Sequence, residues 1–534
     1  MSWLDVPFER ASPLIGAPPD HLKLIFILVS SYPLAHIFTR LPPTAPHLKH
    51  LFSIVLTSFY LVGMFRMKWG YIQLVADAVA VWGIVVGKVG VRRDGRGEGW
   101  MPWLVFVLIM GHLTVNHAYR AFTNIPDSVM EITAMQMVTT MKLITFAWNV
   151  EDGRNYVEPG SNEDKSGSAP ATMSQVDPAL AATRLPPSRI PTLLPFLGYV
   201  LFFPSLIGPA SDYASYEALI DGSIFTSPPG TNEASRKASS PRSARPLIPK
   251  GRKSSAYRKL VTGLIMLGIY AVFGGQWSYG RIIDPELAKV GWWASKGILR
   301  KWMYVMIAGF IARTKYYALW SISEGACILT GIGFNGYSTG SPVSDAPKAL
   351  WDRVENIDIW KIETAQSFKV LFDSWNCRAN VWLRDTMYKR LVKPGQKPGF
   401  APTVMTFVTS AFWHGIGTGY YLAFITAGIC TSLGRQMRHL VRPFFLPENI
   451  ASHSTVPKQI YDVLSWLTVM SLINYVVAAF LLLSWHDCLL AWTRMGWAGH
   501  AVIGIAWIGL KYGGARWLSR ANAQAGRAGA KKTK

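Results

Sequence analysis

The sequence predicts an all-α membrane protein that crosses or enters the bilayer with about eleven transmembrane or re-entrant helices. Of its 534 residues, 50% are hydrophobic and only 16% are charged, whereas about 25% of residues are charged in an average soluble protein. Apolar runs recur along the whole chain with little polar sequence between them. These observations exclude a fully soluble enzyme and favour a polytopic membrane protein.

The predicted membrane segments follow one another from near the N-terminus. The opening residues MSWLDVPFER lack the basic start, apolar core and small-residue cleavage site of a secretory signal, so we expect no cleaved signal peptide. Several apolar runs are short or carry polar residues, which predicts tilted, broken or re-entrant helices among them. The runs span residues 24–38, 51–65, 72–91, 101–119, 130–148, 193–207, 260–273, 303–320, 404–413, 420–433, 460–485 and 501–510.

Positive charge is concentrated in two places. The chain carries 54 Lys and Arg against 31 Asp and Glu, a net charge of +23. Such an excess suits nucleic acid, anionic lipid or cytosolic loops, and the apolar context favours the last two. Residues 223–259 hold many cations beside the acid Glu233, which predicts a cytosolic loop. The end Lys531-Lys532-Thr533-Lys534 resembles a dilysine retrieval signal, so we expect a cytosolic C-terminus and residence in the endoplasmic reticulum.

These patterns define a domain organisation. Residues 1–22 are expected to form an N-terminal extramembrane segment, 23–515 a membrane domain, and 516–534 a basic cytosolic tail. Two flexible extramembrane loops are predicted, at 151–189 and 223–259, because the first is too polar to bury much apolar surface and the second is strongly basic. The cysteines 327, 377, 430 and 488 are far apart and form no CxxC pair, so neither disulfides nor a metal site is expected.

A histidine marks the most chemically informative apolar run. His414 lies within residues 403–429, where Gly415, Gly417 and Gly419 predict a division into two helices. A neutral histidine at such a break can accept a proton, and the small neighbours leave room for a substrate to approach. A histidine that only packs between helices, bonded to a neighbouring carbonyl, fits the spacing equally well.

A second polar position lies in residues 374–391, which read as an amphipathic helix with Trp375 and Trp382 seven residues apart. The amide of Asn376 can hold a hydroxyl or a carbonyl in a reactive geometry, although a helix cap or a polar contact between helices is the alternative. Basic side chains follow Asn376 on the same segment and suit a membrane boundary or phosphate groups. They are Arg378, Arg384, Lys389 and Arg390.

Other polar residues within apolar runs are expected to be structural. His112, Asn116 and His117 share one run, and hydrogen bonding in the core is their expected role because no acidic or cysteine partner for a metal lies nearby in the sequence. Glu324 is an intramembrane carboxylate that could pair with Arg313 or Lys315, or shape a chamber for a head group.

The two segments around Asn376 and His414 carry a family resemblance. Trp375-Asn376 and Trp413-His414-Gly415, followed by Gly419-Tyr420, resemble the hallmark positions of the membrane-bound O-acyltransferase (MBOAT) family. Further stretches resemble its fungal lysophospholipid acyltransferases, namely residues 111–120, 137–149, 198–216 and 322–336. The resemblance implies a fold in which helices enclose a catalytic tunnel. It also implies that His414 and Asn376 are catalytic and that Trp375, Trp413, Gly415 and Tyr420 bind substrate.

The resemblance further implies a reaction. It is transfer of a fatty acyl group from acyl-CoA to the free hydroxyl, expected at sn-2, of a lysophospholipid, with acyl-CoA as co-substrate and no cofactor. His414 would serve as general base and Asn376 would orient substrate, with direct transfer in a ternary complex. A ping-pong route would choose Cys377 as nucleophile, but a thiol in an apolar setting is usually inert. The basic side chains after Asn376 are candidates to meet the CoA phosphates.

The sequence leaves two other functions open. The acceptor could be diacylglycerol, a sterol or a protein instead of a lysophospholipid. A secondary transporter also combines many spans, interrupted helices and buried His, Asn and Glu. No paired inverted halves are visible in the hydropathy of this chain, and transport does not require the Trp-Asn and Trp-His-Gly motifs.

Overall fold

The computed structural model describes residues 3–126, 128–156, 177–225, 247–338, 348–392, 400–446 and 455–532. Within these ranges the regular elements are helices, joined by loops with a few isolated β-bridges. The predicted all-α class is therefore confirmed. The chain divides into two compact units: unit one comprises Met1–Ile265, Ala318–Asn356 and Val381–Lys397, and unit two comprises Met266–Tyr317, Ile357–Asn380 and Pro398–Lys534.

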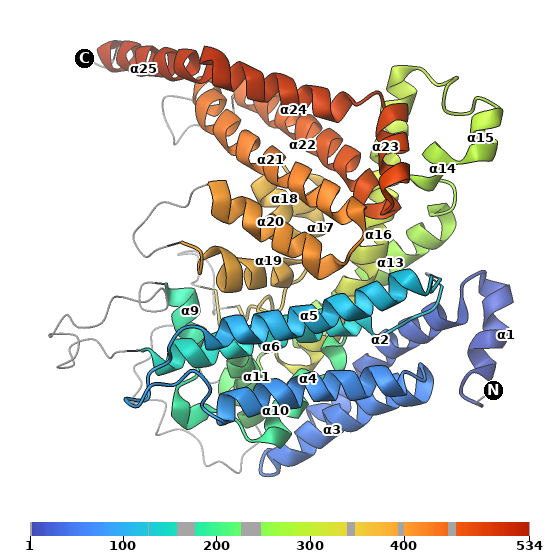
Figure 1. Ribbon diagram of the computed structural model, residues 1–534, viewed down its shortest axis with the longest axis vertical. Helices are drawn as coiled ribbons and strands as arrows, with labels where there is room; N and C mark the ends of the chain where they lie inside the picture. Colours follow the sequence, from blue (N-terminus) through green and yellow to red (C-terminus); the bar gives the residue numbers. More distant parts are fainter. Residues whose placement is uncertain are drawn as a thin grey trace. The chain divides into compact units, whose positions relative to one another are not determined.

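Unit one holds the N-terminal helices (Figure 1). Its elements, with short 3-10 or π segments labelled η, are α1 (Val6–Ile15), α2 (Pro19–Phe38), α3 (Pro46–Ser58), η1 (Phe59–Met64), α4 (Lys68–Val86), α5 (Met101–Phe122), α6 (Thr133–Arg154), α9 (Pro178–Thr183), η2 (Pro187–Arg189), α10 (Leu193–Val200), η3 (Phe203–Ser205), α11 (Tyr213–Asp221), η4 (Ser223–Phe225) and η5 (Arg384–Tyr388). Three helices contribute residues to both units: α13 (Arg252–Phe273), α16 (Ile298–Thr330) and α19 (Cys377–Leu383).

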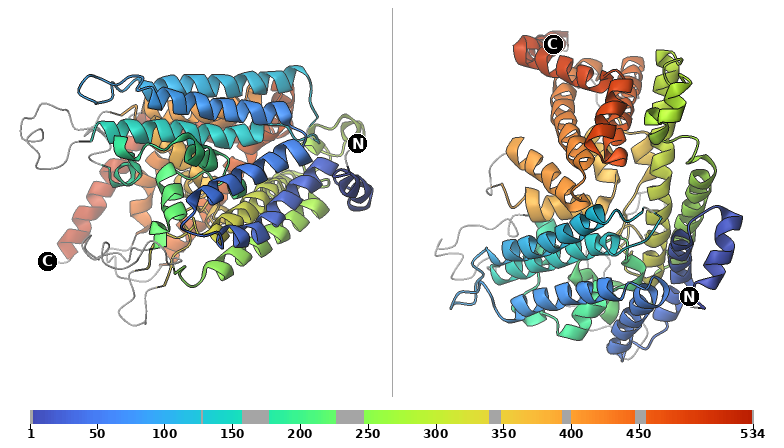
Figure 2. Two further views of the ribbon diagram at one scale, coloured as in Figure 1. Left: turned by 90° about the horizontal axis from the view of Figure 1, so that it is seen from below. Right: turned by 45° about the vertical axis from the view of Figure 1, so that its right-hand side comes forward.

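Helices α4, α5 and α6 run alongside one another in unit one (Figure 2, left). A polar cluster joins them inside their apolar packing. His112 Nδ1 lies 2.7 Å from the Asp77 carboxylate, and the Asn116 amide donates to the side-chain oxygens of Gln73 and Gln136 at 2.8 and 2.7 Å. The prediction of core hydrogen bonding for His112 and Asn116 is confirmed, because an apolar setting favours polar side chains that satisfy one another.

The prediction that Glu324 pairs with Arg313 or Lys315 was wrong. Its carboxylate accepts a bond from Lys259 Nζ at 2.7 Å and another from the Asn356 backbone N–H at 3.1 Å, all within unit one. Glu324 is 1% exposed, so an unpaired charge there would be costly. Arg313 and Lys315 are eleven and nine positions away on the same helix, about 16 and 14 Å along its axis. Lys259, placed in a loop by the sequence, lies in α13.

The limits of the predicted loops also differ from the structure. Helix α6 continues through Arg154, and α9 is anchored at Asp177, which caps it by accepting from the Ala179 N–H. Burial alone would raise the pKa of Asp177, but the ammonium of Lys389, 2.6 Å away, and backbone N–H bonds hold this pKa below its usual value. The ends of the predicted loops 151–189 and 223–259 are thus helical, since α13 begins at Arg252. Their centres, 157–176 and 226–246, lie outside the described residues.

Unit two holds the C-terminal helices (Figure 2, right). Its remaining elements are α14 (Gly280–Ile283), α15 (Pro285–Lys289), α17 (Ile359–Glu363), α18 (Phe368–Ser374), α20 (Phe400–His414), α21 (Thr418–Val441), η6 (Arg442–Phe445), α22 (Val456–Leu482), α23 (Trp485–Arg494), α24 (Ala498–Gly509), η7 (Leu510–Gly514) and α25 (Ala515–Lys532). Helix α21 packs against α20, α22 and α24, and its face toward α22 is made of small residues such as Ala423 and Ala427. Small side chains let two helix backbones approach closely in a membrane.

Five helices in the described part of the chain are long and apolar enough to cross a membrane: α2, α4, α5, α13 and α22. Some of the other predicted segments fall on short helices, such as α10 with 8 residues, α24 with 12 and α20 with 15. Others fall on α6, α16 and α21, which are long enough to cross a membrane but are not among the five helices that combine length with sufficient apolar character. A multi-pass membrane protein is thus supported, while the count of about eleven membrane segments stays a prediction. The outer segments expected at 1–22 and 516–534 are largely helical, as α1 and α25.

Candidate active site

The helix break predicted around His414 is confirmed. His414 is the last residue of α20, and α21 begins at Thr418. Gly415 follows the histidine with a φ of +137°, a conformation that side-chain-bearing residues rarely adopt. Glycine therefore ends α20 directly after His414 and places the imidazole at a tight turn.

One hydrogen bond sets the chemical character of His414. Its Nδ1 lies 2.7 Å from the backbone carbonyl oxygen of Ser410, one helical turn earlier. A carbonyl oxygen can only accept, so Nδ1 carries the proton and donates. In the neutral ring this leaves Nε2 as the nitrogen that accepts a proton. In the neutral imidazole, this bond thus leaves the lone pair on Nε2.

Aromatic rings surround the imidazole. The ring centres of Trp413, Phe424, Phe480 and Tyr420 lie 4.7, 4.9, 5.3 and 5.6 Å from that of His414. Such rings restrict the number of water molecules that can reach the base, and they offer apolar surface to an acyl chain. The half-buried imidazole lies among them on one side of the turn.

Close packing of α21 on the end of α22 brings Phe480 to this site. The Gly419 N–H donates to the Leu483 carbonyl at 2.7 Å. A Cβ at position 419 would lie 2.2 Å from the Ala479 carbonyl oxygen and 2.7 Å from Leu483 Cα. Because both obstacles are backbone atoms, any larger residue at position 419 would force the helices apart and move Phe480 away from His414.

Asn376 lies in a turn and not, as expected, within a helix. It sits between α18 and α19 with a φ of +44°. Asparagine tolerates this left-handed conformation better than most residues, which explains the residue type. Its backbone carbonyl accepts from the Asn380 N–H at 3.0 Å, whereas no described group hydrogen-bonds to its side-chain amide. The amide therefore keeps donor and acceptor capacity that no described group uses.

The turn at Asn376 is fixed by its neighbours. Trp375 forms an isolated antiparallel bridge with Ile357, and the Ser374 carbonyl accepts from the Asp358 N–H at 3.1 Å. The Trp375 ring meets the edges of Tyr316 and Tyr317, with ring centres 5.5 and 5.9 Å away. A short bridge and two aromatic contacts thus hold the backbone immediately before Asn376.

A contact between two phenylalanines connects the two candidate positions. Phe372, four residues before Asn376, meets Phe407 with ring centres 5.6 Å apart. Phe407 lies on α20, seven residues or about two turns before His414. Phe372 also packs against the buried clusters that α21 and α22 share. The structure therefore brings α18 and α20 together within unit two, although the sequence separates them.

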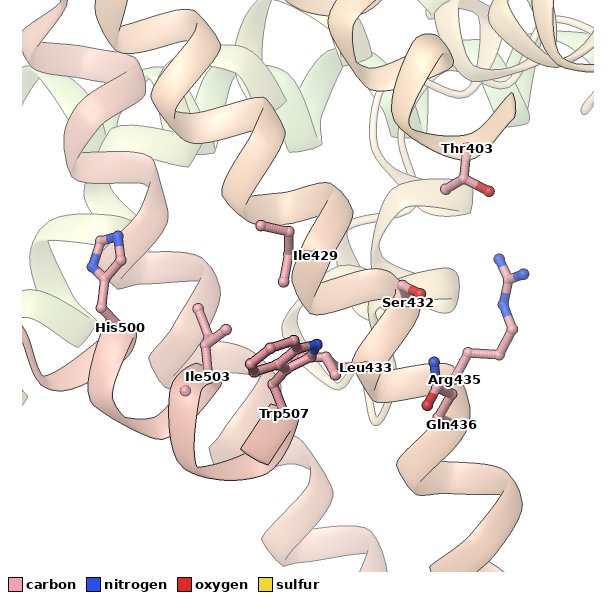
Figure 3. A pocket seen from close by; sticks show the side chains of 10 residues that line it. Thr403, Ile429, Ser432, Leu433, Arg435, Gln436, His500, Ile503 and Trp507 are labelled. Atoms are coloured by element: carbon pink, nitrogen blue, oxygen red, sulfur yellow. The ribbon is translucent and has the colours of Figure 1, made fainter. Parts of the chain in front are cut away.

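A groove opens between α20, α21 and α24 (Figure 3). It has a volume of about 840 Å³, and most of its surface is apolar. One wall begins at Thr403, eleven residues before His414 on α20, or about 16 Å along the helix. Ile429, Leu433, Ile503 and Trp507 form its apolar part, and the exposed side chains of Arg435 and Gln436 lie at its edge.

The basic residues after Asn376 are mostly paired with acids. In unit one, Arg390 makes a bidentate ion pair with the nearly buried Asp152 at 2.8 and 2.7 Å. Lys389 bridges Asp177 and Asp385, and Arg384 also binds Asp385. These three cations, which were candidates for the CoA phosphates, thus stabilise the fold around α6 and η5.

Part of the site was not predicted from the sequence. The spacing of Ser410 and Phe424, each one turn from a predicted site residue, was a usable signal. Phe480 is 66 positions after His414, and nothing in the local sequence connects the two. Among the described residues, no group of three or more His, Cys, Asp or Glu side chains is placed to hold a metal ion.

The fold and the site define an integral membrane protein with a candidate base at a helix break. Comparison with known proteins identifies the class. The model of the MBOAT, membrane-bound O-acyltransferase family, matches residues 118–495. The chain therefore belongs to the membrane-bound O-acyltransferase family and is an O-acyltransferase.

Curated relatives extend the similarity over most of the chain. It is 38% identical to the lysophospholipid acyltransferase of Schizosaccharomyces pombe, over 94% of this chain and 88% of that protein. It is 33% identical to the lysophospholipid acyltransferase of Saccharomyces cerevisiae, over 90% and 72%. A mouse protein, membrane-bound glycerophospholipid O-acyltransferase 1, is 27% identical over 89% and 86%.

Proposed function

We propose that this protein transfers a fatty acyl group from acyl-CoA to the free sn-2 hydroxyl of a lysophospholipid. The names of the fungal relatives support the acceptor. The observation that carries the chemistry is the bond from His414 Nδ1 to the Ser410 carbonyl, because it leaves Nε2 as a base. The mostly apolar groove on the same helix pair, with Arg435 at its edge, suits amphiphilic substrates.

In the proposed reaction, His414 Nε2 takes the proton of the lysophospholipid hydroxyl as its oxygen attacks the thioester carbonyl carbon. The C–S bond then breaks, and the imidazolium returns the proton to the CoA sulfur. A weakly acidic alcohol needs such a base, and general base catalysis contributes roughly two to four orders of magnitude in rate. The surrounding aromatic rings keep out water that would hydrolyse the thioester.

Asn376 orients the reacting groups in this scheme. Its amide can donate to the thioester carbonyl oxygen or accept from the hydroxyl, and either bond favours the reactive geometry. We assign substrate contact to Trp375, Trp413 and Tyr420, whose rings line the two turns, and to Gly415, whose φ of +137° shapes the turn directly after His414. Direct transfer needs no acyl-enzyme, so Cys377 has no covalent role.

The proposal is tested with membranes from cells that express the protein and lack competing acyltransferases. Labelled acyl-CoA is supplied with lysophospholipids of different head groups, and in parallel with diacylglycerol or a sterol. We expect labelled diacyl phospholipid with at least one lysophospholipid. Labelling only of triacylglycerol or sterol ester would replace the acceptor, and absence of any labelled product would overturn the proposed activity.

We also propose that the protein resides in the endoplasmic reticulum with a cytosolic C-terminus. The support is the basic end of the chain, Lys531-Lys532-Thr533-Lys534. Replacing Lys531 and Lys532 by Ser should let part of the protein reach the Golgi without changing acyl transfer in microsomes. Protease added to sealed microsomes should remove a C-terminal tag. A protected tag would reverse the topology, and an unchanged location would refute retrieval by the dilysine.

A further inference from the structure

A buried ionic network lies behind the turn that carries Asn376. Arg313 on α16 binds the Glu363 carboxylate through Nε at 2.9 Å and Nη2 at 2.8 Å. Tyr317, one turn later on α16, donates its hydroxyl to the same carboxylate at 2.6 Å. Arg313 and Tyr317 are 6% and 0% exposed. A bidentate pair of this kind fixes both distance and orientation.

Other bonds hold the network in place. The third Arg313 nitrogen donates to the Asn474 side-chain oxygen on α22, and Trp466 donates to the Glu363 carbonyl at 2.7 Å. A Cβ at Gly309 would lie 2.1 Å from that Asn474 oxygen, so only glycine leaves it room. The network thus connects α16, α17 and α22 with little freedom to shift.

The network reaches Asn376 through one aromatic contact. The Tyr317 ring, oriented by its bond to Glu363, packs on Trp375 in a T-shaped contact, with ring centres 5.9 Å apart and planes at 63°. Trp375 is the residue before Asn376, whose φ of +44° is a conformation that persists when its surroundings determine it. We propose that Tyr317 is a positioning residue, which holds the Trp375–Asn376 turn in the geometry that acyl transfer requires.

This inference rests on the proposed role of Asn376 in acyl transfer. A purely structural network would contribute stability alone, as any buried hydrogen bond does. A positioning role adds two effects: a slower chemical step at unchanged substrate binding, and a looser turn at Asn376. Both can be measured separately from stability.

Tyr317→Phe is the informative variant, because it keeps the ring against Trp375 and removes only the hydroxyl. Arg313 still pairs with Glu363, so no buried charge is left alone. Tyr304→Phe is the matched control. Tyr304 is also buried in unit two, donates to the Ser278 carbonyl at 3.0 Å, and packs on Trp292 and not on Trp375.

Kinetics provide the first readout. We expect Tyr317→Phe to lower kcat about three- to tenfold with KM for both substrates nearly unchanged, since small displacements of a positioning group slow the chemical step. Tyr304→Phe should keep kcat within about a factor of two while losing similar stability. Equal kcat in wild type and Tyr317→Phe would overturn the inference. Absence of acyl transfer in the wild type would instead refute the proposed function.

Cys377 provides a second readout that does not depend on activity. It directly follows Asn376 and is the partly exposed cysteine, whereas Cys327, Cys430 and Cys488 are buried. We expect Tyr317→Phe to increase the maleimide labelling rate of Cys377 severalfold, with the three buried thiols unlabelled and Tyr304→Phe like the wild type. An unchanged labelling rate, or equal increases in both variants, would contradict a positioning role for Tyr317.

Discussion

Each unit of the molecule contains a histidine and an asparagine that the sequence singled out, one pair on α5 and the other at two turns, and the two pairs differ in what their polar atoms contact. In unit one, His112 bonds the Asp77 carboxylate, and the Asn116 amide donates to two glutamine oxygens. In unit two, His414 donates to a backbone carbonyl, and no described group bonds to the Asn376 amide. The residue types are the same, but the polar side chains of the first pair are bonded to other side chains of the protein.

The difference shows which pair can do chemistry. The carboxylate beside His112 bonds its ring, and the surrounding polar side chains link three helices, which is a structural role. A carbonyl beside His414 fixes the tautomer without adding a full charge, so the ring can accept a proton during a reaction. The contacts of the atoms, rather than the presence of His and Asn in an apolar run, separate a packing pair from a candidate active site.

The largest expected effect is at His414. His414→Ala should lower the acyl transfer rate by about two to four orders of magnitude, because the base is removed. The protein level in the membrane should not change, since the side chain lies at a half-buried turn. The measurement is the initial rate of acyl transfer in microsomes that contain equal amounts of the wild type and of the variant. Near-normal turnover would remove His414 from the mechanism.

A smaller effect is expected at Asn376. Asn376→Ala and Asn376→Gly should each lower kcat about ten- to hundredfold, because both remove the amide that orients substrate. The glycine variant is the control for the backbone, since glycine adopts a φ of +44° without strain. If Asn376→Gly retained normal kcat while Asn376→Ala lost it, the backbone and not the amide would matter.

For His112→Ala we expect a loss of stability and little change in activity. His112→Ala leaves the Asp77 carboxylate without its histidine, which should cost about 1–3 kcal/mol of folding free energy. Thermal unfolding in detergent, followed by size-exclusion chromatography, measures this loss. The rate per folded molecule should stay within about threefold of wild type. A stable variant with no activity would place His112 in the chemistry and break the comparison.

The smallest effect is expected at Cys377. Cys377→Ala should keep the rate within about a factor of two, because direct transfer requires no thiol next to Asn376. Mass spectrometry after a brief reaction with acyl-CoA provides the complementary test. An acyl group trapped on Cys377, together with an inactive alanine variant, would establish a ping-pong route.

Much of the fold class and the position of the helix break could be predicted because they depend on local sequence. Apolar runs indicate membrane helices. Gly415 ends α20 through its own backbone conformation, which does not depend on distant parts of the chain. The partner of Glu324 could not be found in this way, since Lys259 lies on a different helix, 65 positions earlier. Pairing across helices depends on tertiary packing, which a single sequence does not display.

In the candidate site, too, some residues could be predicted from the local sequence and others could not. His414 and Asn376 stood out because polar residues inside apolar runs are costly and need a reason. The aromatic ring of Phe480 and the carboxylate of Glu363 had no such signal, because each reaches the site from a separate helix. Asn376 was expected inside a helix, yet its left-handed φ places it in a turn. Helix periodicity alone does not reveal a single residue of this kind.

The central claim is that His414, and not His112, supplies the base. The most direct test is the pH dependence of kcat for the wild type and for His112→Gln, measured in the same vesicles. A base acts only when unprotonated, so kcat should fall as the pH is lowered, and His112→Gln should show the same fall at the same pH. A fall that disappears in His112→Gln, or a wild-type kcat that does not decrease at acid pH, would contradict the account.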